Sequence, residues 1–291
     1  MLAYFGPGGN CERFYAEGHK SSLEIPLWLK EQGLNAYEYE CGKGIKISEE
    51  SAKKLGERAK ENGIRLSLHA PYFISLSSQD AEKRLKSVEY ILNSMALAKT
   101  LGADRVVVHS GSCKDITRRE ALSLAAETLK AAQERADSEG FSRIHICPET
   151  MGKINQLGTV EEVVKLCEID ERFIPTVDFG HVNARTLGGL KETVDFERIF
   201  DIIRDKLGSE RERSFHIHYS RIEFTNAGEK KHRTYRETEY GPEFEPIAEI
   251  IAKRGLCPTI ICESRGTQTD DAYLLREKYL EAVKENETNT K

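Results

Sequence analysis

The sequence predicts a single α/β domain, a closed parallel (β/α)8 barrel of the TIM-barrel type. Strand-like and helix-like segments alternate along the chain roughly every 30–40 residues. Its 291 residues are a common length for one such barrel. Six successive strand-like runs end on or beside a histidine or an acid; they are residues 65–69, 105–109, 144–149, 174–178, 214–218 and 259–263. We expect the barrel to span residues 1–285 and residues 286–291 to be a frayed carboxyl-terminal tail.

The first third of the chain contains two strand–helix pairs and a third strand. Residues 2–5 are apolar and lead into a glycine-rich loop, so they predict the first strand. Residues 22–32 are helical up to a glycine that caps the helix, and residues 36–40 alternate as a second strand. A serine N-cap and first-turn acids open a helix over residues 48–63, before the strand at residues 65–69.

The middle of the chain repeats this order. Residues 80–101 are a long amphipathic helix that Gly102 closes before the strand at residues 105–109. Residues 117–140 repeat the pattern before the strand at residues 144–149, and residues 160–167 form a shorter helix.

Three further strands complete the expected eight. Each is separated from the next by a helical stretch, which indicates parallel pairing throughout. The remaining segments are strand 174–178, helix 196–207, strand 214–218, helix 243–253, strand 259–263 and helix 270–284.

Composition excludes several classes of protein. No apolar run is long enough to cross a bilayer, and residues 1–6 lack the basic start of a secretion signal, so we expect a cytoplasmic location. The net charge of −5 gives no global signal for nucleic acid. Seven cysteines without a Cys-x-x-Cys pair argue against a disulfide framework and a thiolate zinc site.

The polar strand endings predict a metal site. Active sites of such barrels lie at the carboxyl ends of the strands, where these side chains converge. Imidazoles and carboxylates suit zinc, with manganese or iron as alternatives. The residues expected there are His69, His109, Asp178, His181, His216 and Glu263. Gly180 would permit the tight turn that returns His181 to the cavity.

Three other histidines have a structural interpretation. His145 is in the middle of a strand, and His19 is in a polar loop. His218 shares side-chain parity with His216 but lies two residues further out. We expect all three to be structural or surface residues.

The motifs resemble, in order and spacing, those of the endonuclease IV family of apurinic/apyrimidinic (AP) endonucleases, in the xylose-isomerase-like TIM barrel superfamily. The resemblance covers nearly the whole barrel. It rests on His69-Ala70-Pro71-Tyr72, His109 with Ser110-Gly111-Ser112, Pro148-Glu149-Thr150, Asp178-x-x-His181, His216 with Ser220, His232, and Cys262-Glu263.

The resemblance implies two or three zinc ions per chain, with manganese as an alternative. One ion would be held by His69, His109 and Glu149. Glu149 would bridge to the second ion. That second set is Glu149, Asp178, His216 and Glu263, and the third is His181 with His232. Glu149 and Glu263 are the expected catalytic carboxylates, and Tyr72 and Phe73 the expected DNA contacts.

One position departs from the family pattern. The family pairs its last loop histidine with an aspartate two residues earlier, where this chain has Lys230. A protonated lysine has no lone pair for a metal. Either Glu229 takes this place, or the third ion is weakly bound or absent.

The implied activity is cleavage of DNA 5′ to abasic sites, a step of base excision repair. Metals about 3.5–4 Å apart would activate a shared water for in-line attack on the phosphodiester and leave a 3′ hydroxyl. The expected partner is DNA containing abasic sites. We expect a monomer, with no membrane association and no protein partner.

Two other functions remain open. Sugar isomerases and epimerases of the same superfamily use a single metal with a set like Glu149, Asp178, His216 and Glu263. The extra histidines have no required place in such an enzyme, whereas Lys230 favours a repurposed relative. The other alternative is a DNA-binding or scaffold protein that binds metal without turnover.

Overall fold

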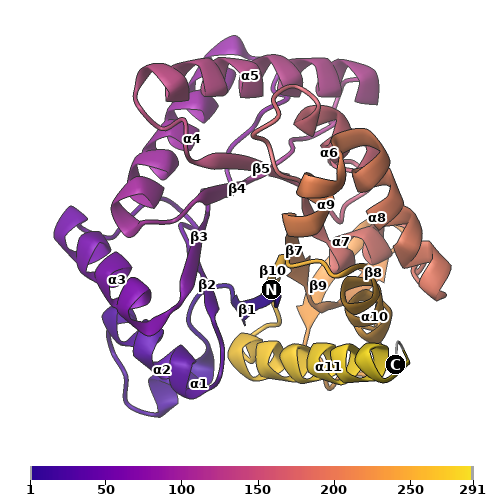
Figure 1. Cartoon of the computed structure of the whole chain (residues 1–291). Helices are drawn as coiled ribbons and strands as arrows, with labels where there is room; N and C mark the ends of the chain where they lie inside the picture. The colour runs from indigo at the N-terminus through magenta and orange to yellow at the C-terminus, as the bar shows by residue number, and fades with distance from the viewer. Residues whose placement is uncertain (1, 290–291) are drawn as a thin grey trace.

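The computed structural model describes residues 2–289, and its centre is a barrel of eight parallel strands with the helices outside (Figure 1). The predicted fold is confirmed. The neighbouring order is β1-β10-β7-β6-β5-β4-β3-β2. The barrel strands are β1 (Tyr4–Pro7), β2 (Ala36–Glu40), β3 (Arg65–His69), β4 (Arg105–His109), β5 (His145–Glu149), β6 (Thr176–Asp178), β7 (His216–Tyr219) and β10 (Thr259–Cys262).

The ring closes between β1 and β2. Gly8 forms a parallel bridge with Glu38, and the Asn35 N–H donates to the Phe5 carbonyl at 3.1 Å. A Cβ atom on Gly6 would lie 1.7 Å from the Ala36 carbonyl oxygen. Only glycine therefore allows the first two strands to approach this closely.

Helices cover the outside of the barrel, and several begin at the expected caps. The side chains of Ser48, Asp80, Thr117 and Thr159 each accept an N–H bond from the first turn. The helices are α1 (Glu12–Ala16), α2 (Ile25–Glu31), α3 (Glu49–Asn62), α4 (Ala81–Leu101), α5 (Arg118–Ser138), α6 (Val160–Cys167), α7 (Phe179–Arg185), α8 (Thr193–Leu207), α9 (Ser209–Ser214), α10 (Glu245–Arg254) and α11 (Gln268–Asn289), with a 3-10 turn at Ser22–Glu24.

The carboxyl-terminal end differs from the expectation. Helix α11 continues to Asn289, so residues 286–289 are helical rather than frayed, and residues 290 and 291 lie outside the described part of the chain. Leu275 and Tyr279 are buried against the barrel, and the Tyr279 hydroxyl accepts a bond from the Ala3 N–H at 3.4 Å. Burial of this face anchors the helix across β1.

A hairpin that the sequence did not predict follows β7. Strands β8 (Arg221–Thr225) and β9 (Gly228–Arg233) pair antiparallel, outside the barrel. They pack against α7, which begins at the carboxyl end of β6. The hairpin therefore extends the end of the barrel at which the polar strand tips lie.

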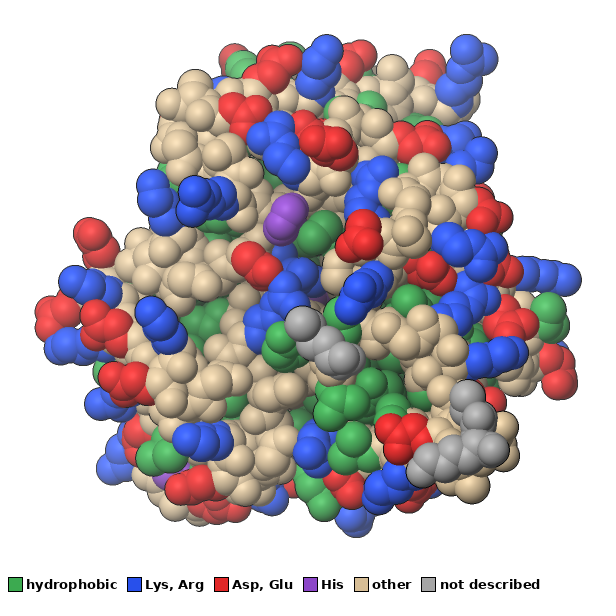
Figure 2. All heavy atoms as spheres, viewed as in Figure 1, with side chains coloured by type: hydrophobic (Ala, Val, Ile, Leu, Met, Phe, Trp, Pro, Cys, Tyr) green, Lys and Arg blue, Asp and Glu red, His purple; other side chains and the backbone are tan. Residues whose placement is uncertain are grey.

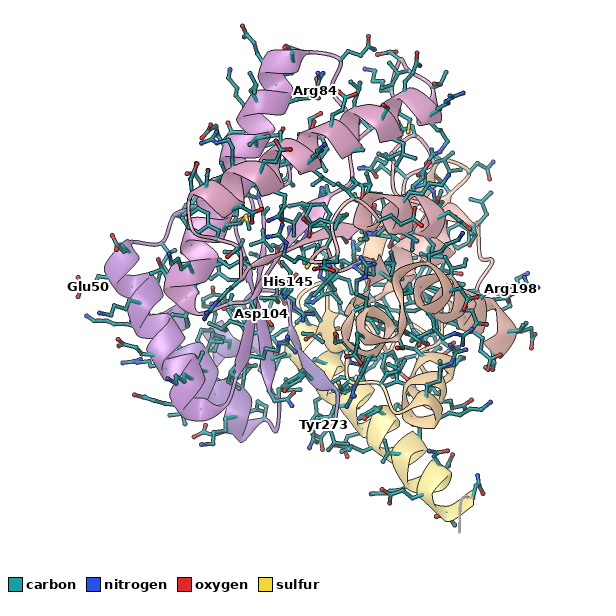
Figure 3. The ribbon with its side chains drawn as sticks, turned by 45° about the horizontal axis from the view of Figure 1, so that its top comes forward. Glu50, Arg84, Asp104, His145, Arg198 and Tyr273 are labelled. Atoms are coloured by element: carbon teal, nitrogen blue, oxygen red, sulfur yellow. The ribbon has the colours of Figure 1, made fainter. Side chains whose placement is uncertain are left out.

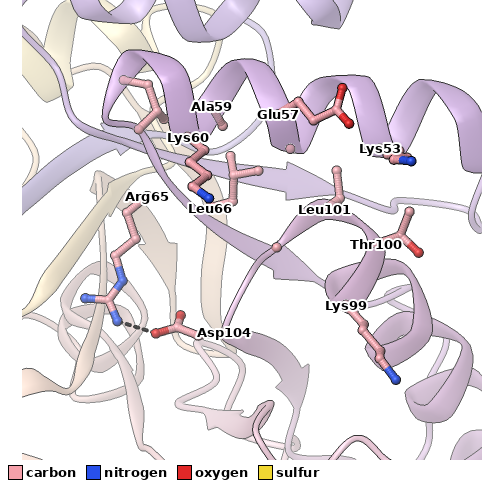
Figure 4. Close-up of a pocket in the computed structure, with 13 residues that line it drawn as sticks. Lys53, Glu57, Ala59, Lys60, Arg65, Leu66, Lys99, Thr100, Leu101 and Asp104 are labelled. Atoms are coloured by element: carbon pink, nitrogen blue, oxygen red, sulfur yellow. Dashed lines mark hydrogen bonds and ion pairs between the residues drawn. The ribbon is translucent and has the colours of Figure 1, made fainter.

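The opposite end of the barrel contains a separate hollow between α3 and α4, of about 510 Å³ (Figure 4). Lys53, Lys60 and Lys99 line it, and an Arg65–Asp104 ion pair of 2.5 Å lies beside it. Asp104 also lies near His145, at the amino-terminal ends of β4 and β5 (Figure 3). Because barrel active sites lie at the carboxyl ends of strands, this hollow is not where we place the chemistry.

Acidic and basic side chains alternate over the face seen in Figure 2, without a large area of one sign. Within residues 2–289, none of the helices combines the length and the apolar character that a membrane span requires.

Candidate metal centre

A cavity of about 400 Å³ opens at the carboxyl ends of the strands. Its lining is dominated by imidazoles and carboxylates from strands that are far apart in sequence. These are Glu40, His69, His109, Glu149, His181, Glu229, His232 and Glu263. The structure thus brings together most of the residues that the strand endings singled out.

The first group of donor atoms surrounds one oxygen of Glu149. The Nε2 atoms of His69 and His109 lie 3.3 and 3.6 Å from Glu149 Oε2. His69 Nδ1 is 2.8 Å from the Ala70 carbonyl oxygen, which can only accept. Nδ1 of His69 therefore carries a proton, and Nε2 faces the cluster, where a metal could replace its proton.

The second group surrounds the other oxygen of Glu149, and it contains His218 where His216 was expected. His218 Nδ1 lies 3.2 Å from Glu149 Oε1 and 3.2 Å from Glu263 Oε1, and Asp178 completes the group. The reason is strand register. Asp178 pairs with His218, whereas His216 pairs with Thr176 and so lies one layer deeper in the barrel.

Asp178 supplies its Oδ2 atom to this group, and that oxygen lies 3.3 Å from His181 Nδ1. Asp178 is the N-cap residue of α7, and its Oδ1 accepts the His181 N–H at 2.7 Å. Its Oδ2 is buried and has no hydrogen-bond partner. Gly180 serves close packing rather than an unusual turn, because a Cβ atom there would lie 2.7 Å from the Ser220 carbonyl oxygen.

The third group contains Glu229 in the place of the family's aspartate. Glu229 Oε2 lies 3.6 Å from His181 Nε2, and Glu229 Oε1 lies 3.8 Å from His232 Nε2. Lys230 points elsewhere and pairs with Glu223 at 2.5 Å. The position therefore has a carboxylate despite the lysine in the sequence.

A β-bulge explains how Glu229 reaches His232. Glu223 pairs with Lys231 and Phe224 pairs with Glu229, which leaves Lys230 unpaired in the ladder. One extra residue shifts the alternation of the strand, so side chains three residues apart share a face. Glu229 and His232 consequently point to the same side.

Two neighbours shape the third group. The Ser220 hydroxyl bonds His232 Nδ1 at 2.9 Å, which directs Nε2 toward Glu229. Gly152 leaves room, since a Cβ atom there would lie 2.6 Å from Glu229 Cβ and 2.9 Å from His181 Cδ2.

The pKa values of the imidazoles and carboxyls in this cavity differ widely. Burial lowers the pKa of His69, but Glu40 and Glu149 outweigh burial and raise it to about 10. Burial lowers the pKa of His109 to about 4 and raises that of Glu263 to about 8. Such close acids and imidazoles form a site where a divalent cation can replace protons.

The residues present fit a metal. With bonds of about 2.0–2.2 Å, two ligands of a tetrahedral site lie about 3.4 Å apart. The imidazole–carboxylate separations in the three groups span 3.2–3.8 Å. Glu149 is only 1% exposed and Asp178 is fully buried, so their charges need compensation, which protonated imidazoles or a bound metal can supply.

The other residues that the sequence analysis named do not belong to the three metal groups. Tyr72 is 52% exposed and lines the cavity, whereas Phe73 packs on Tyr90 with ring centroids 4.7 Å apart. His145 Nδ1 contacts the Arg172 carbonyl oxygen at 2.6 Å, outside the cavity. His19 pairs with Glu24 at 2.8 Å. The DNA-contact role of both aromatics stays a prediction.

Sequence reasoning missed two acids on β2. Glu40 lines the cavity beside His69, and burial raises its pKa to about 7. Glu38 is fully buried and lies 2.8 Å from His218 Nε2. The signal was the sequence Tyr37-Glu38-Tyr39-Glu40. Its two acids are two residues apart, so they lie on the same face of an expected strand.

Sequence comparisons give related proteins. A family model described as xylose isomerase-like TIM barrel matches residues 26–284. A "Probable endonuclease 4" of Mycoplasma genitalium is 30% identical over 222 residues, 75% of this chain and 72% of that protein. A Methanocaldococcus jannaschii protein described as uncharacterized is 27% identical over 276 residues, 95% of this chain and 97% of its own length.

Solved structures share the fold. Endonuclease IV from Thermus thermophilus has a TM-score of 0.68 at 19% identity, covering 98% of this chain and 100% of that one. A D-tagatose 3-epimerase-like protein has a TM-score of 0.66 at 22% identity, covering 87% of this chain and 90% of that one. At these identities the likeness concerns the fold alone.

Proposed function

The chain belongs to the xylose isomerase-like TIM barrel family and is endonuclease IV-like within it, and from this premise we propose that it is a zinc-dependent phosphodiesterase cleaving DNA 5′ to abasic sites. One observation carries the proposal. Three groups of metal-ligating atoms converge in one cavity, and the group of His181, Glu229 and His232 has no required place in a single-metal isomerase.

Glu149 joins the first two groups. Its Oε2 faces His69 and His109, and its Oε1 faces His218, so one carboxylate would hold two ions as a bridge. Bound divalent metals would supply an activated water and stabilise charge on the phosphodiester. The His69, His109, Glu149, Asp178, His181, His218, Glu229, His232 and Glu263 side chains would hold two to three zinc ions, or manganese.

Glu263 connects the second and third groups. Its Oε1 lies by His218, and its Oε2 is 4.0 Å from His232 Nδ1. We assign to this carboxylate the acceptance of the proton from the attacking water. Lys153 at the rim would pair with a backbone phosphate, and Tyr72 would pack on the exposed deoxyribose.

The test is a duplex oligonucleotide that carries one tetrahydrofuran abasic analogue, incubated with zinc-loaded protein. We expect a single cut 5′ to the analogue and a 3′ hydroxyl that a polymerase extends. An undamaged duplex and the Glu149→Gln variant are the controls. An intact abasic substrate at high concentrations of zinc-loaded enzyme contradicts the proposal.

A sugar epimerase is the second candidate. It is favoured by the group of Glu149, Asp178, His218 and Glu263, which could hold one metal between two acids suited to proton transfer at carbon. The fold shared with a D-tagatose 3-epimerase-like protein supports it. Turnover of a ketose, with no effect of removing His109 or His232, would favour this function.

A further inference from the structure

Beneath the cavity, four side chains form a connected cluster inside the barrel. Glu38 and His216 are fully buried, and Ser67 and Arg105 are each 2% exposed. His218 Nε2 reaches down to this cluster from the cavity. We propose that Glu38 is a positioning residue that fixes the proton of His218 on Nε2 and so aims its Nδ1 lone pair at the metal.

The donors and acceptors can be assigned one by one. Arg105 Nη1 lies 3.5 Å from His216 Nδ1, and a guanidinium can only donate. His216 Nδ1 is therefore an acceptor, and its ring proton is on Nε2. That nitrogen lies 3.0 Å from Glu38 Oε2 as an ion pair, and Glu38 Oε2 accepts the Ser67 hydroxyl at 2.7 Å.

The second oxygen of Glu38 is left for His218. Glu38 Oε1 lies 2.8 Å from His218 Nε2 as an ion pair, and neither buried atom makes a well-aligned hydrogen bond. A carboxylate accepts only, so the proton belongs to Nε2 of His218. The opposite nitrogen, Nδ1, hydrogen-bonds Glu149 Oε1 at 3.2 Å and lies 3.2 Å from Glu263 Oε1, so its proton is the one that a metal held by these carboxylates would replace.

The contacts between Glu38 and its two histidines are shorter than the contacts between the proposed metal ligands in the cavity. The two Glu38–imidazole contacts are 2.8 and 3.0 Å, the length of a charge-assisted hydrogen bond. Two ligands on one tetrahedral ion would lie about 3.4 Å apart, as the pairs in the cavity do. Glu38, His216 and His218 also lie close enough together to hold a cation, and it is the shorter separations that favour protons between them.

The chain treats its other histidines in the same way. His69 and His181 each direct Nδ1 at a backbone carbonyl oxygen, of Ala70 at 2.8 Å and of Thr150 at 3.0 Å. Partners of this kind orient metal-binding imidazoles and raise their basicity. His218 differs because its partner is a carboxylate, which would make it the most basic ligand of the set.

The inference rests on the metal site of the proposed function but not on its substrate. Glu38→Gln keeps the shape and removes the charge. A glutamine has one accepting oxygen, and its amide donors would face an imidazole that already presents N–H. We expect zinc affinity at the central position to fall about 10- to 100-fold. The visible spectrum of the cobalt-substituted protein should also change.

Ser67→Ala is the matched control, because it removes a neighbouring hydrogen bond and leaves the carboxylate. In a competition assay with a chromophoric chelator, we expect the loss of zinc affinity in Ser67→Ala to be at least about fivefold smaller than the loss in Glu38→Gln. Equal losses in the two variants would overturn the inference in favour of general packing, as would unchanged affinity and spectrum in Glu38→Gln. A zinc ion that the wild type holds at Glu38 would also overturn it.

Nuclear magnetic resonance of histidine-labelled, zinc-loaded wild type gives a readout that needs no variant to fold. We expect the His218 ring to carry a slowly exchanging Nε2 proton, with Nδ1 bound to zinc. Zinc on Nε2 would overturn the inference. If the protein binds zinc in this manner but leaves abasic DNA intact, the proposed function fails while the role of Glu38 stands.

Discussion

Glu229 shows how a single side chain changes the meaning of a sequence. The lysine at position 230 removes the ligand expected two residues before His232, yet Glu229 lies between His181 and His232. Lys230 is neutralised by Glu223 on the facing strand and does not enter the cavity.

Substitution at these adjacent positions should have opposite outcomes. We expect Glu229→Gln to lose about one zinc ion per chain, because an amide is a weak zinc ligand. Lys230→Met should keep the wild-type content, since Lys230 makes only an exposed ion pair. Elemental analysis of protein dialysed against limiting zinc checks this; equal metal content in wild type and Glu229→Gln contradicts it.

Glu40 places a further carboxylate where an anionic substrate would bind. It lines the cavity without joining any of the three groups described above. A like charge about 4 Å from a phosphodiester weakens binding by about 1 kcal/mol where water screens the pair as in bulk solution.

We therefore expect Glu40→Gln to lower KM for abasic DNA about fivefold, with a smaller change in kcat. Steady-state kinetics at low salt measure this, and Glu57→Gln, in the hollow at the opposite end of the barrel, is the control. An increase in KM would indicate instead that Glu40 contacts the substrate as an acceptor.

At the scale of elements, the bulge in β9 decides which residues face the cavity. A regular strand puts residues two apart on one face, whereas the bulge at Lys230 lets residues three apart do so. The family has its acid two residues before the histidine, whereas Glu229 and His232 are three residues apart. The bulge changes the backbone register, so both side chains still face the cavity.

Deleting Lys230 tests this interpretation. The deletion removes the unpaired residue and leaves the acid and histidine two apart in a regular ladder, so both should still face the cavity. We expect the deletion variant to retain the third zinc ion, whereas an alanine inserted after Lys231 should lose it. Loss of zinc in the deletion variant, with the fold intact by circular dichroism, would contradict the role of the bulge.

At the scale of the whole molecule, the metal groups join strands from all around the barrel. Ligands come from β3, β4, β5, β6 and β7, from the residue that follows β10, from α7 and from the hairpin. Any ligand that binds only the folded chain stabilises it, by about 4 kcal/mol at a concentration a thousand times its Kd.

Removal of metal should therefore lower the thermal stability of the chain. We expect a chelator to reduce Tm by about 8–16 °C, given about 2–4 °C per kcal/mol for larger domains. Differential scanning fluorimetry with and without added zinc measures the shift. Glu149→Gln should show little response to zinc, and an identical shift in that variant would place the stabilising ion elsewhere.

The parts of this architecture that depend on local signals could be predicted from the sequence. The strand tips at His69, His109, Glu149 and Asp178 follow from apolar runs that end on a polar residue, and the barrel brings them together.

The remaining assignments needed three-dimensional information. Choosing His218 over His216 requires the depth of β7 relative to β6, which strand register decides and alternation does not. Choosing Glu229 over an empty or weak third site required the bulge, and Glu38 required knowing which face of β2 points inward.

The most direct test of the whole account is a crystal structure of zinc-loaded protein with anomalous diffraction at the zinc edge. We expect peaks within the groups of His69, His109 and Glu149, of Glu149, Asp178, His218 and Glu263, and of His181, Glu229 and His232, with none at Glu38. A single peak confined to the central group would contradict the multinuclear phosphodiesterase and favour the epimerase.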